Sequence, residues 1–266
     1  DSSRPNSKCY MWVHRSGEFY SERPIVIYEY QKGRDHQKPL SFYKDYKGIL
    51  VTDGLQQYHL VDKKLPGVTN ANCWAHARRD FADAVKAMDK KDPSAVRNSV
   101  AYVALQKIGE FYNADTELKG LSSEERLQKR QETIQPLVED FFAWVKEQIS
   151  QCTVPPKSKT GQGLQYLIHQ ETYLKVFLTD GDVPIDNSAS ERSIRTFCIG
   201  KKNWMFYNTA NGASASAMVY SISETAKLND LRPYYYFRYI LTELPKRSDE
   251  NGNIDPSKLD DLMPWS

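Results

Sequence analysis

The residues best suited to chemistry lie between Val183 and Ala217, in the stretch VPIDNSASERSIRTFCIGKKNWMFYNTANGASASA. Glu191 stands in the first turn of a predicted helix, where the helix dipole favours a carboxylate. The start of this helix is marked by three residues that can cap free N–H groups, Asp186, Asn187 and Ser188. Because Asn187 precedes Glu191 by one turn, both side chains can face the same point.

Four cationic residues follow Glu191 closely: Arg192, Arg195, Lys201 and Lys202. A carboxylate fixed among cations suits a site that binds a divalent metal and a polyanion together. The alternative is an ordinary amphipathic helix with a solvated basic face, because runs of charge usually mark solvated surface.

A second carboxylate, Asp53, follows the apolar run Ile49–Val51. This run predicts a buried strand that ends at Asp53, where Gly54 lets the backbone turn. Open α/β sheets bind ligands at the carboxyl ends of their strands, so Asp53 is a candidate site residue. The alternative is a turn aspartate that only terminates the strand.

The segment VTNANC, from Val68 to Cys73, predicts another short strand, which runs directly into the helical segment CWAHARRDFADAVKAM. Cys73 and His76 stand three residues apart there. A structural zinc site would need two further ligands, so we expect His76 to pack or hydrogen-bond near the active site.

Composition sets broad limits on the class of protein. The chain has 266 residues, so it could form one large domain or two small ones. Its formal net charge is only +2, so a nucleic-acid partner must be argued from where the cations cluster. Four cysteines without paired spacing, and no secretory segment, predict reduced thiols in a cytoplasmic protein: Cys9, Cys73, Cys152 and Cys198. No apolar run approaches the roughly 20 residues needed to span a bilayer.

The remaining elements predict a mixed α/β chain. Lys8 to His14 and Pro24 to Gln31 are rich in β-branched and aromatic residues and predict an antiparallel strand pair, and His36 to Lys47 predicts a short helix. From about Asp92 to Asp180 we expect long helices without strands. A helix of small residues (212–229), expected to lie against the sheet or its neighbours, and a tyrosine-rich helix (232–244) follow.

Five motifs, in this order, closely resemble the bacterial transposases of the insertion-sequence-66 family: TDG at Asp53, CWAHARRDF from Cys73, DNSASERSIRTFCIGKKNWMF from Asp186, GASASAMVYSISETAKLN, and the terminal LMPW. The resemblance implies a ribonuclease-H-like fold, a mixed sheet flanked by helices, with an all-helical insertion before the helix of the catalytic glutamate. It also implies that catalytic Asp, Asp and Glu residues bind two divalent metal ions, Mg²⁺ or Mn²⁺, and cut and rejoin DNA.

The resemblance assigns Asp53 as the second catalytic aspartate and Glu191 as the glutamate, both as metal ligands. Cys73 and His76 match a C-x-x-H motif found after the second aspartate, and together with Asn187 we expect them to support the active site. We expect six residues to contact DNA phosphates: Arg78, Arg79, Arg192, Arg195, Lys201 and Lys202.

The first aspartate is where this chain departs from the family pattern. It belongs to an Ala-Asp-Glu-Thr run before the strand matched by CYMWV, and no such run is present here. We therefore expect it upstream of Asp1 and expect the chain alone to be an inactive catalytic-core fragment. Its expected parts are 1–91 and 181–245 for the core, 92–180 for the helical insertion, and 246–266 for a tail.

The expected partners are the element ends and the target DNA, bound by a homo-oligomer in the bacterial cytoplasm, at the nucleoid when on DNA. Two alternatives remain open. One is a related metal nuclease that only hydrolyses DNA, and the other is a non-catalytic DNA-binding or assembly protein derived from a transposase.

Overall fold

The computed structural model describes residues 9–20, 22–33, 37–88 and 91–266. The chain divides into two compact units. The first is discontinuous, Asp1–Arg34 with Ala189–Ser266, and we call it the hairpin unit; the second is Asp35–Ser188, the bundle unit.

The hairpin unit is built on the antiparallel pair predicted from sequence. Strand β1 (Tyr10–Arg15) pairs with β2 (Val26–Gln31), with Tyr10 opposite Gln31 and Arg15 opposite Val26. The β-branched and aromatic residues of the two segments favour this pleated arrangement, and the polar residues between them supply the turn.

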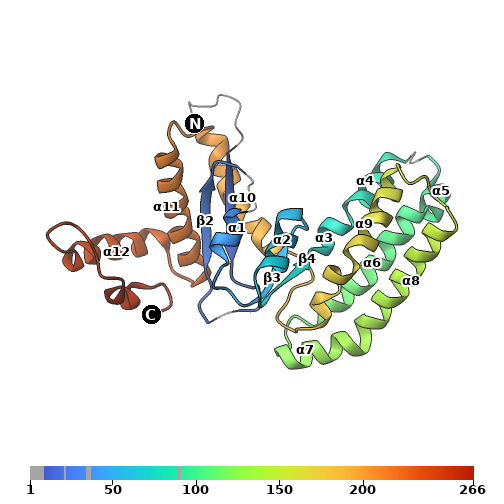
Figure 1. Cartoon of the computed structure of the whole chain (residues 1–266), viewed down its shortest axis with the longest axis horizontal. Helices are drawn as coiled ribbons and strands as arrows, with labels where there is room; N and C mark the ends of the chain where they lie inside the picture. The colour runs from blue at the N-terminus through green and yellow to red at the C-terminus, as the bar shows by residue number, and fades with distance from the viewer. Residues whose placement is uncertain (1–8, 21, 34–36, 89–90) are drawn as a thin grey trace. The chain divides into compact units, whose positions relative to one another are not determined.

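Three helices complete the hairpin unit: α10 (Ser188–Trp204, of which Ser188 still counts with the bundle unit), α11 (Ala210–Leu228) and α12 (Pro233–Arg247). Helix α11 runs beside β2 (Figure 1), as its small residues predicted. The Val26 N–H donates to Thr225 Oγ1 at 3.1 Å and the Tyr28 N–H donates to Ser221 Oγ at 2.8 Å. Side chains of α11 therefore satisfy backbone donors along the edge of β2 that faces away from β1.

The C-terminal residues fold back onto this unit. Two short 3₁₀ helices, Pro256–Lys258 and Asp260–Leu262, follow α12, and the Leu262 side chain is buried. The Tyr236 hydroxyl donates to the Leu262 carbonyl at 2.8 Å. The apolar end of the tail thus packs against α12.

The bundle unit contains the second strand pair. Strands β3 (Gly48–Thr52) and β4 (Val68–Asn72) are parallel, and helix α2 (Gln56–Lys64) connects them; helix α1 (Gln37–Phe42) precedes β3. Among the described residues the strands thus form two separate two-stranded sheets, β1–β2 and β3–β4. The structure confirms a mixed α/β class, and the single mixed sheet of a ribonuclease-H-like fold remains an expectation.

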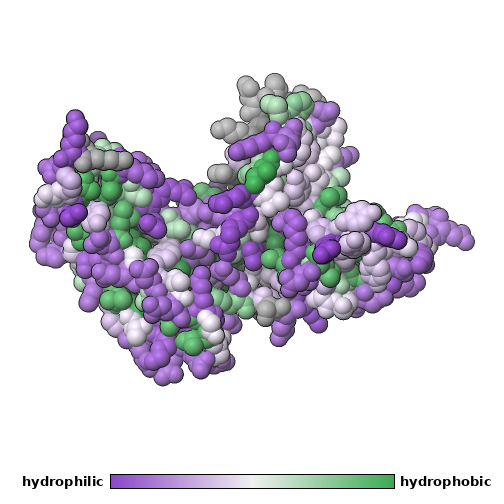
Figure 2. Space-filling view, turned by 180° about the vertical axis from the view of Figure 1, so that it is seen from behind, coloured by the Kyte–Doolittle hydropathy of each residue, from purple (hydrophilic) through white to green (hydrophobic). Residues whose placement is uncertain are grey.

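Beyond β4 every element that the structure describes in the bundle unit is helical. The bounds are α3 Trp74–Ala77, α4 Arg79–Ala87, α5 Pro93–Asn98, α6 Val100–Glu117, α7 Ser123–Lys129, a π-helical turn Arg130–Ile134, α8 Gln135–Ser150, α9 Lys159–Leu174 and a 3₁₀ helix Val176–Leu178. Helices α4, α6, α8 and α9 pack as a ring, each against the next (Figure 1). Figure 2 shows mainly hydrophilic residues on the outer face of this bundle.

The prediction of one continuous helix from Cys73 was wrong, because the helix breaks at Arg78, between α3 and α4. Trp74 explains the break. Its backbone N–H donates to Ile185 O at 3.2 Å and its indole N–H donates to Leu174 O at 2.8 Å, which anchors α3 in the core. Helix α4 instead follows the bundle, where Phe81 is fully buried.

Candidate active site

Asp53 lies at the edge of the sheet that the sequence predicted. Because β3 and β4 are parallel and in register, with Thr52 opposite Asn72, the residues that follow both strands emerge at the same edge. The half-buried Asp53 accepts a hydrogen bond from the Leu55 N–H through Oδ1 at 3.1 Å. This bond fixes the Asp53 carboxylate at the carboxyl end of the β3–β4 strand pair.

A buried chain of amide and hydroxyl groups supports this edge. Thr52 Oγ1 donates to Asn70 Oδ1 at 3.0 Å, and Asn70 Nδ2 donates to Asn72 Oδ1 at 2.9 Å. Asn72 Nδ2 donates in turn to Gln170 Oε1 on α9 at 2.8 Å. Because buried polar groups are costly unless paired, this chain fixes how α9 meets the strand ends.

Cys73 follows β4 as Asp53 follows β3. Its side chain is fully buried, and its Sγ accepts a hydrogen bond from the Asn187 N–H at 3.4 Å. Burial raises the pKa of the Cys73 thiol to about 11, so at neutral pH the sulfur is a neutral thiol. Such a group holds the Asn187 backbone in place; it is not a nucleophile. His76 lies half-buried on α3.

The Asp186–Asn187 dipeptide meets the strand edge through this sulfur contact. Asp186 Oδ1 accepts from the Ser188 N–H at 2.8 Å and so caps α10, as the sequence predicted. Asp186 Oδ2 accepts from the Tyr112 hydroxyl at 3.2 Å. Burial, with the charge of Asp186 adding to it, raises the pKa of Tyr112, so this hydroxyl remains a donor.

Two buried oxygen atoms at this site have no hydrogen-bond partner within the described part of the chain, Asn187 Oδ1 and Tyr166 Oη. Tyr166 comes from α9; burial raises its pKa to about 12, and the charge of Asp53 adds to this effect, whereas the charge of Arg79 opposes it. Arg78 similarly opposes the raised pKa of Tyr112. The two arginines predicted from sequence therefore place positive charge near the tyrosines of this site.

Buried arginines hold the segment that leads to Asp186. Arg130 Nη1 donates to the carbonyls of Phe177, Asp180 and Val183 at 2.9, 3.1 and 2.8 Å. Arg130 Nε donates to Asp115 Oδ1 at 2.7 Å. Arg130 Nη1 also donates to Gly181 O at 3.5 Å. Because the guanidinium bonds to four carbonyls of one segment, it fixes the path of the chain just before the site.

Glu191 belongs to the hairpin unit, on the first turn of α10, and its side chain is exposed. Side chains of both strands hold this turn. Arg15 Nη1 donates to Ala189 O at 2.9 Å, and the Tyr28 hydroxyl donates to Ser193 O at 2.6 Å. The backbone that carries Glu191 is thus bonded to the hairpin on both sides of the residue.

The cations of α10 differ in their partners. Arg192 Nη2 forms an ion pair with Glu18 Oε1 at 2.8 Å. Arg195, Lys201 and Lys202 are exposed and form no ion pair with any residue that the structure describes. Exposed pairs are weak, so Arg192 can exchange Glu18 for another anion.

The oxygen donors of both units are of the type that Mg²⁺ and Mn²⁺ prefer. The bundle unit offers the Asp53 carboxylate and Asn187 Oδ1, and the hairpin unit offers the Glu191 carboxylate. Within the described ranges, no group of three or more His, Cys, Asp or Glu side chains is arranged to hold a metal ion. Neither unit by itself therefore holds such a group among its described residues.

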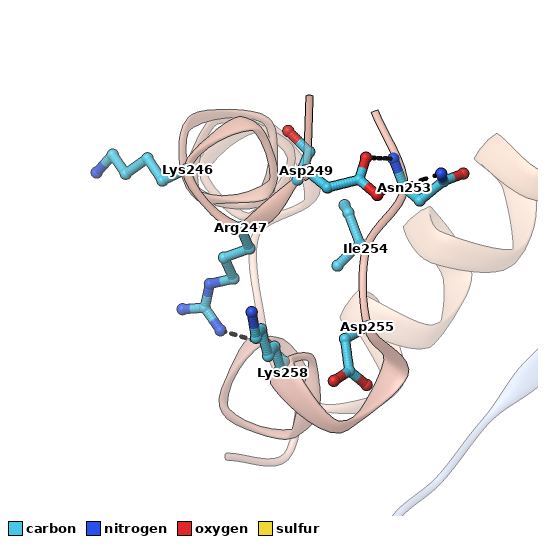
Figure 3. A pocket seen from close by; sticks show the side chains of 8 residues that line it. Lys246, Arg247, Asp249, Asn253, Ile254, Asp255 and Lys258 are labelled. Carbon is cyan, nitrogen blue, oxygen red and sulfur yellow. Dashed lines mark hydrogen bonds between the residues drawn. The ribbon is translucent and has the colours of Figure 1, made fainter. Parts of the chain in front are cut away.

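A cavity of about 540 Å³ lies away from these residues, in the C-terminal element (Figure 3). The carboxylate of Asp249 lines this cavity and is of a type that can bind a metal ion. Its Oδ1, however, accepts hydrogen bonds from the N–H groups of Asn251 and Asn253, at 2.9 and 2.8 Å. Arg247 pairs with Asp261. These contacts close a tight hairpin turn, and we assign no ligand to this cavity.

Sequence reasoning missed Tyr112, Tyr166 and Arg15 as site residues. Tyr112 contacts a residue 74 positions away, and Arg15 contacts one 174 positions away. Helical spacing marked the two tyrosines only as members of helices. No local signal could have found them.

The described residues thus combine a mixed α/β fold, an acidic residue at the end of a parallel strand and a glutamate on a helix with several basic residues. The Transposase IS66 family model matches residues 1–215, and the IS66 C-terminal element matches residues 221–265. The chain therefore belongs to the IS66 transposase family.

The relatives come from Sinorhizobium fredii. Uncharacterized protein y4hP is 29% identical over 91% of this chain and 44% of its own length, and uncharacterized protein y4qI is 28% identical over 99% of this chain and 48% of its own. The chain thus spans about half the length of the curated relatives it matches. No solved structure matches it. Among the helices that the structure describes, none is long and apolar enough to cross a membrane.

Proposed function

We propose that this chain carries the catalytic core of a DNA transposase, which cleaves a DNA strand and transfers it to a target with divalent metal ions. The observation that carries the proposal is the position of Asp53 at the end of β3. Cys73, which follows the paired strand β4, is bonded to the Asp186–Asn187 loop that opens the helix of Glu191. Family membership supports it.

In this proposal Asp53 and Glu191 hold Mg²⁺ or Mn²⁺, together with the first aspartate of the family pattern. Asn187 Oδ1, buried without a partner among the described residues, is available to orient a metal-bound water or to ligate. Bound metal ions would activate the attacking oxygen and stabilise the leaving oxygen. Tyr112 and Cys73 position the loop, and six cations hold phosphates without reading sequence: Arg78, Arg79, Arg192, Arg195, Lys201 and Lys202.

We further propose that both strand pairs belong to a ribonuclease-H-like core (1–91 and 181–245) interrupted by a helical insertion (92–180), before a tail (246–266). The order of hairpin, helix α1 and the parallel pair around α2 supports this assignment. The insertion is supported by its elements, because every one between residues 92 and 180 is helical. We expect the protein to act as a homo-oligomer, since two element ends need two active sites.

The test is metal-dependent cleavage and strand transfer by the complete reading frame, because the relatives are about twice as long as this chain. Glu191→Gln and Asp53→Asn should each lower the Mn²⁺-dependent rate at least about 100-fold, given what charge stabilisation contributes. Asp45→Asn, an exposed carboxylate paired with Lys44, is the control and should leave the rate unchanged.

Three results separate the candidate functions. Strand transfer lost in both variants supports the transposase. Metal-dependent nicking without joining of a 3′ end would indicate a nuclease that only hydrolyses. DNA binding without any metal-dependent cleavage, equal in wild type and variants, would indicate a non-catalytic assembly protein.

A further inference from the structure

The hairpin unit contains an aromatic cavity of about 240 Å³ that none of the roles above uses. It lies between the strands β1–β2 and the segment that joins α10 to α11. The side chains that matter here are Tyr30, Phe197, Lys201, Trp204, Phe206 and Tyr207. We call this the aromatic cavity.

The walls of the aromatic cavity are held in place by contacts among themselves. The rings of Trp204 and Tyr207 lie 4.3 Å apart between centroids, and those of Phe197 and Trp204 lie 5.5 Å apart, edge to face. The Tyr207 hydroxyl donates to Ser216 Oγ at 2.7 Å. A ligand would thus meet ordered rings and lose little entropy in fixing them.

Phe206 stands at the rim and is 72% exposed. The residue before it, Met205, is 70% exposed and has a φ of 59°, a backbone conformation that residues other than glycine seldom adopt. The backbone therefore turns sharply at the end of α10 and leaves two large apolar side chains at the surface. Exposed apolar groups beside a cavity mark a contact surface.

Positive charge lies beside the rings. Lys201 lines the cavity, Lys202 follows it, and neither forms an ion pair with a described residue. Helix α11 begins at the cavity: Thr209 Oγ1 accepts from the Gly212 N–H at 3.0 Å, and Ala210 lines the wall. The start of this 19-residue helix carries partial positive charge, which favours an anion.

We propose that the aromatic cavity binds an unstacked base of single-stranded DNA, with Lys201 and the start of α11 on the adjacent phosphate. Rings that stack a base, beside cations that hold its backbone, are the combination that binds single strands. A purely apolar peptide would use the rings but not the charge, and a duplex base has both faces covered. The inference rests on the proposed function, because it takes DNA as the substrate.

The experiment measures binding of the whole chain to short oligonucleotides by fluorescence anisotropy. One is a single-stranded thymidine oligonucleotide, and the other is an abasic strand of equal length and charge. Wild type should bind the thymidine strand about 5- to 100-fold more tightly, since stacking of one base contributes that much. Phe206→Ala should remove most of this difference, and Phe206→Leu should also remove it, although it keeps an apolar side chain.

The matched control is Tyr234→Ala, which removes an aromatic ring that is equally exposed (72%) but lies on α12, outside the cavity. It should keep the full difference. Lys201→Gln should weaken binding of both strands alike and lower the salt dependence by about 0.7 unit of slope. Thermal melting should show that all four variants fold, because the substituted side chains are exposed.

Several outcomes would overturn the inference. If wild type bound the thymidine and abasic strands equally, the cavity would not bind a base. The proposed DNA function would be unaffected by that result. An equal loss in Tyr234→Ala would mean that aromatic contacts are not specific to this cavity. If thymidine monophosphate displaced the thymidine strand at the same concentration of nucleotides, the aromatic cavity would be a pocket for free nucleotides. If neither single-stranded nor duplex DNA bound at all, the proposed function itself would fail.

Discussion

Arg130 and Asp115 form an ion pair inside the bundle unit, with Arg130 Nε 2.7 Å from Asp115 Oδ1 and both side chains almost completely buried. The same guanidinium bonds to four carbonyls between Phe177 and Val183. Arg130 also opens the π-helical turn that joins α7 to α8. The irregular turn therefore has a structural use: it carries the charge that fixes the approach to the candidate active site.

Removing one partner of the Arg130–Asp115 ion pair should destabilise the folded chain. Asp115→Ala leaves the guanidinium buried without a counter-charge, so we expect the free energy of unfolding to fall by about 3 to 5 kcal/mol. Urea denaturation followed by circular dichroism measures it. Glu132→Ala, which breaks the exposed pair with Lys129, is the control and should hardly move the midpoint. A midpoint for Asp115→Ala equal to the control value would contradict the role of the buried pair.

Two glycine substitutions should change stability in opposite directions. Gly54 has a φ of +81°, and a Cβ there would lie 2.4 Å from Tyr166 Oη, so Gly54→Ala should lower the free energy of unfolding by about 1 to 3 kcal/mol. Gly109 lies inside α6 with nothing within 4 Å, so Gly109→Ala should raise it by about 0.5 to 1 kcal/mol. Thermal melting compares them, and a shift of the same sign for both would contradict this account of Gly54.

Cys73 should make stability depend on pH in the alkaline range. Burial raises its pKa from the ordinary value of 9.0 to about 11 in the folded chain. The neutral thiol is therefore favoured by folding; the contribution is fully present below pH 9 and is lost as the pH rises towards 11. Stability of wild type should fall more steeply over that range than stability of Cys73→Ala.

The same burial should protect Cys73 from alkylation at pH 8, which mass spectrometry measures. Cys9, Cys152 and Cys198 are exposed and should react first. Early alkylation of Cys73 would show that the site opens or that the thiol is not buried.

The cations should act through phosphates. Replacing Arg195 and Lys202 together by glutamine should weaken duplex binding about equally for unrelated sequences and reduce the slope of log K against log salt by nearly two units. Lys227→Gln is the control, because Lys227 already pairs with Glu224 at 2.6 Å on α11. If the slope were unchanged in the double variant, Arg195 and Lys202 would not contact phosphates. Their face of α10 would then be an ordinary solvated surface.

Local patterns predicted the elements of this chain well. Enrichment in β-branched and aromatic residues marked β1 and β2, and three candidate capping residues marked the region in which α10 starts. In the structure α10 begins at Ser188, whose N–H donates to Asp186. The break at Arg78 was missed because it depends on Trp74 being anchored by Ile185 and Leu174. Those contacts span 100 residues or more, and periodicity within a window contains no information about them.

The candidate site shows the same limit. Family motifs pointed to Asp53 and Glu191, and these roles stay predictions. Tyr112, Tyr166 and Arg15 were not predicted, because they are ordinary members of a helix or strand until the fold brings distant partners to them. The charge on Asp186 matters to Tyr112 only in the folded chain.

The discontinuity of the hairpin unit sets an order of events during synthesis. The bundle unit is one continuous segment, Asp35–Ser188, which can fold as it leaves the ribosome. The β1–β2 hairpin is made before the bundle unit, yet the hydroxyls that satisfy Val26 and Tyr28 belong to Thr225 and Ser221, nearly 200 residues later. Until α11 emerges, the outer edge of β2 stays open to pairing with another strand, so a hairpin made before the bundle unit is protected only after it.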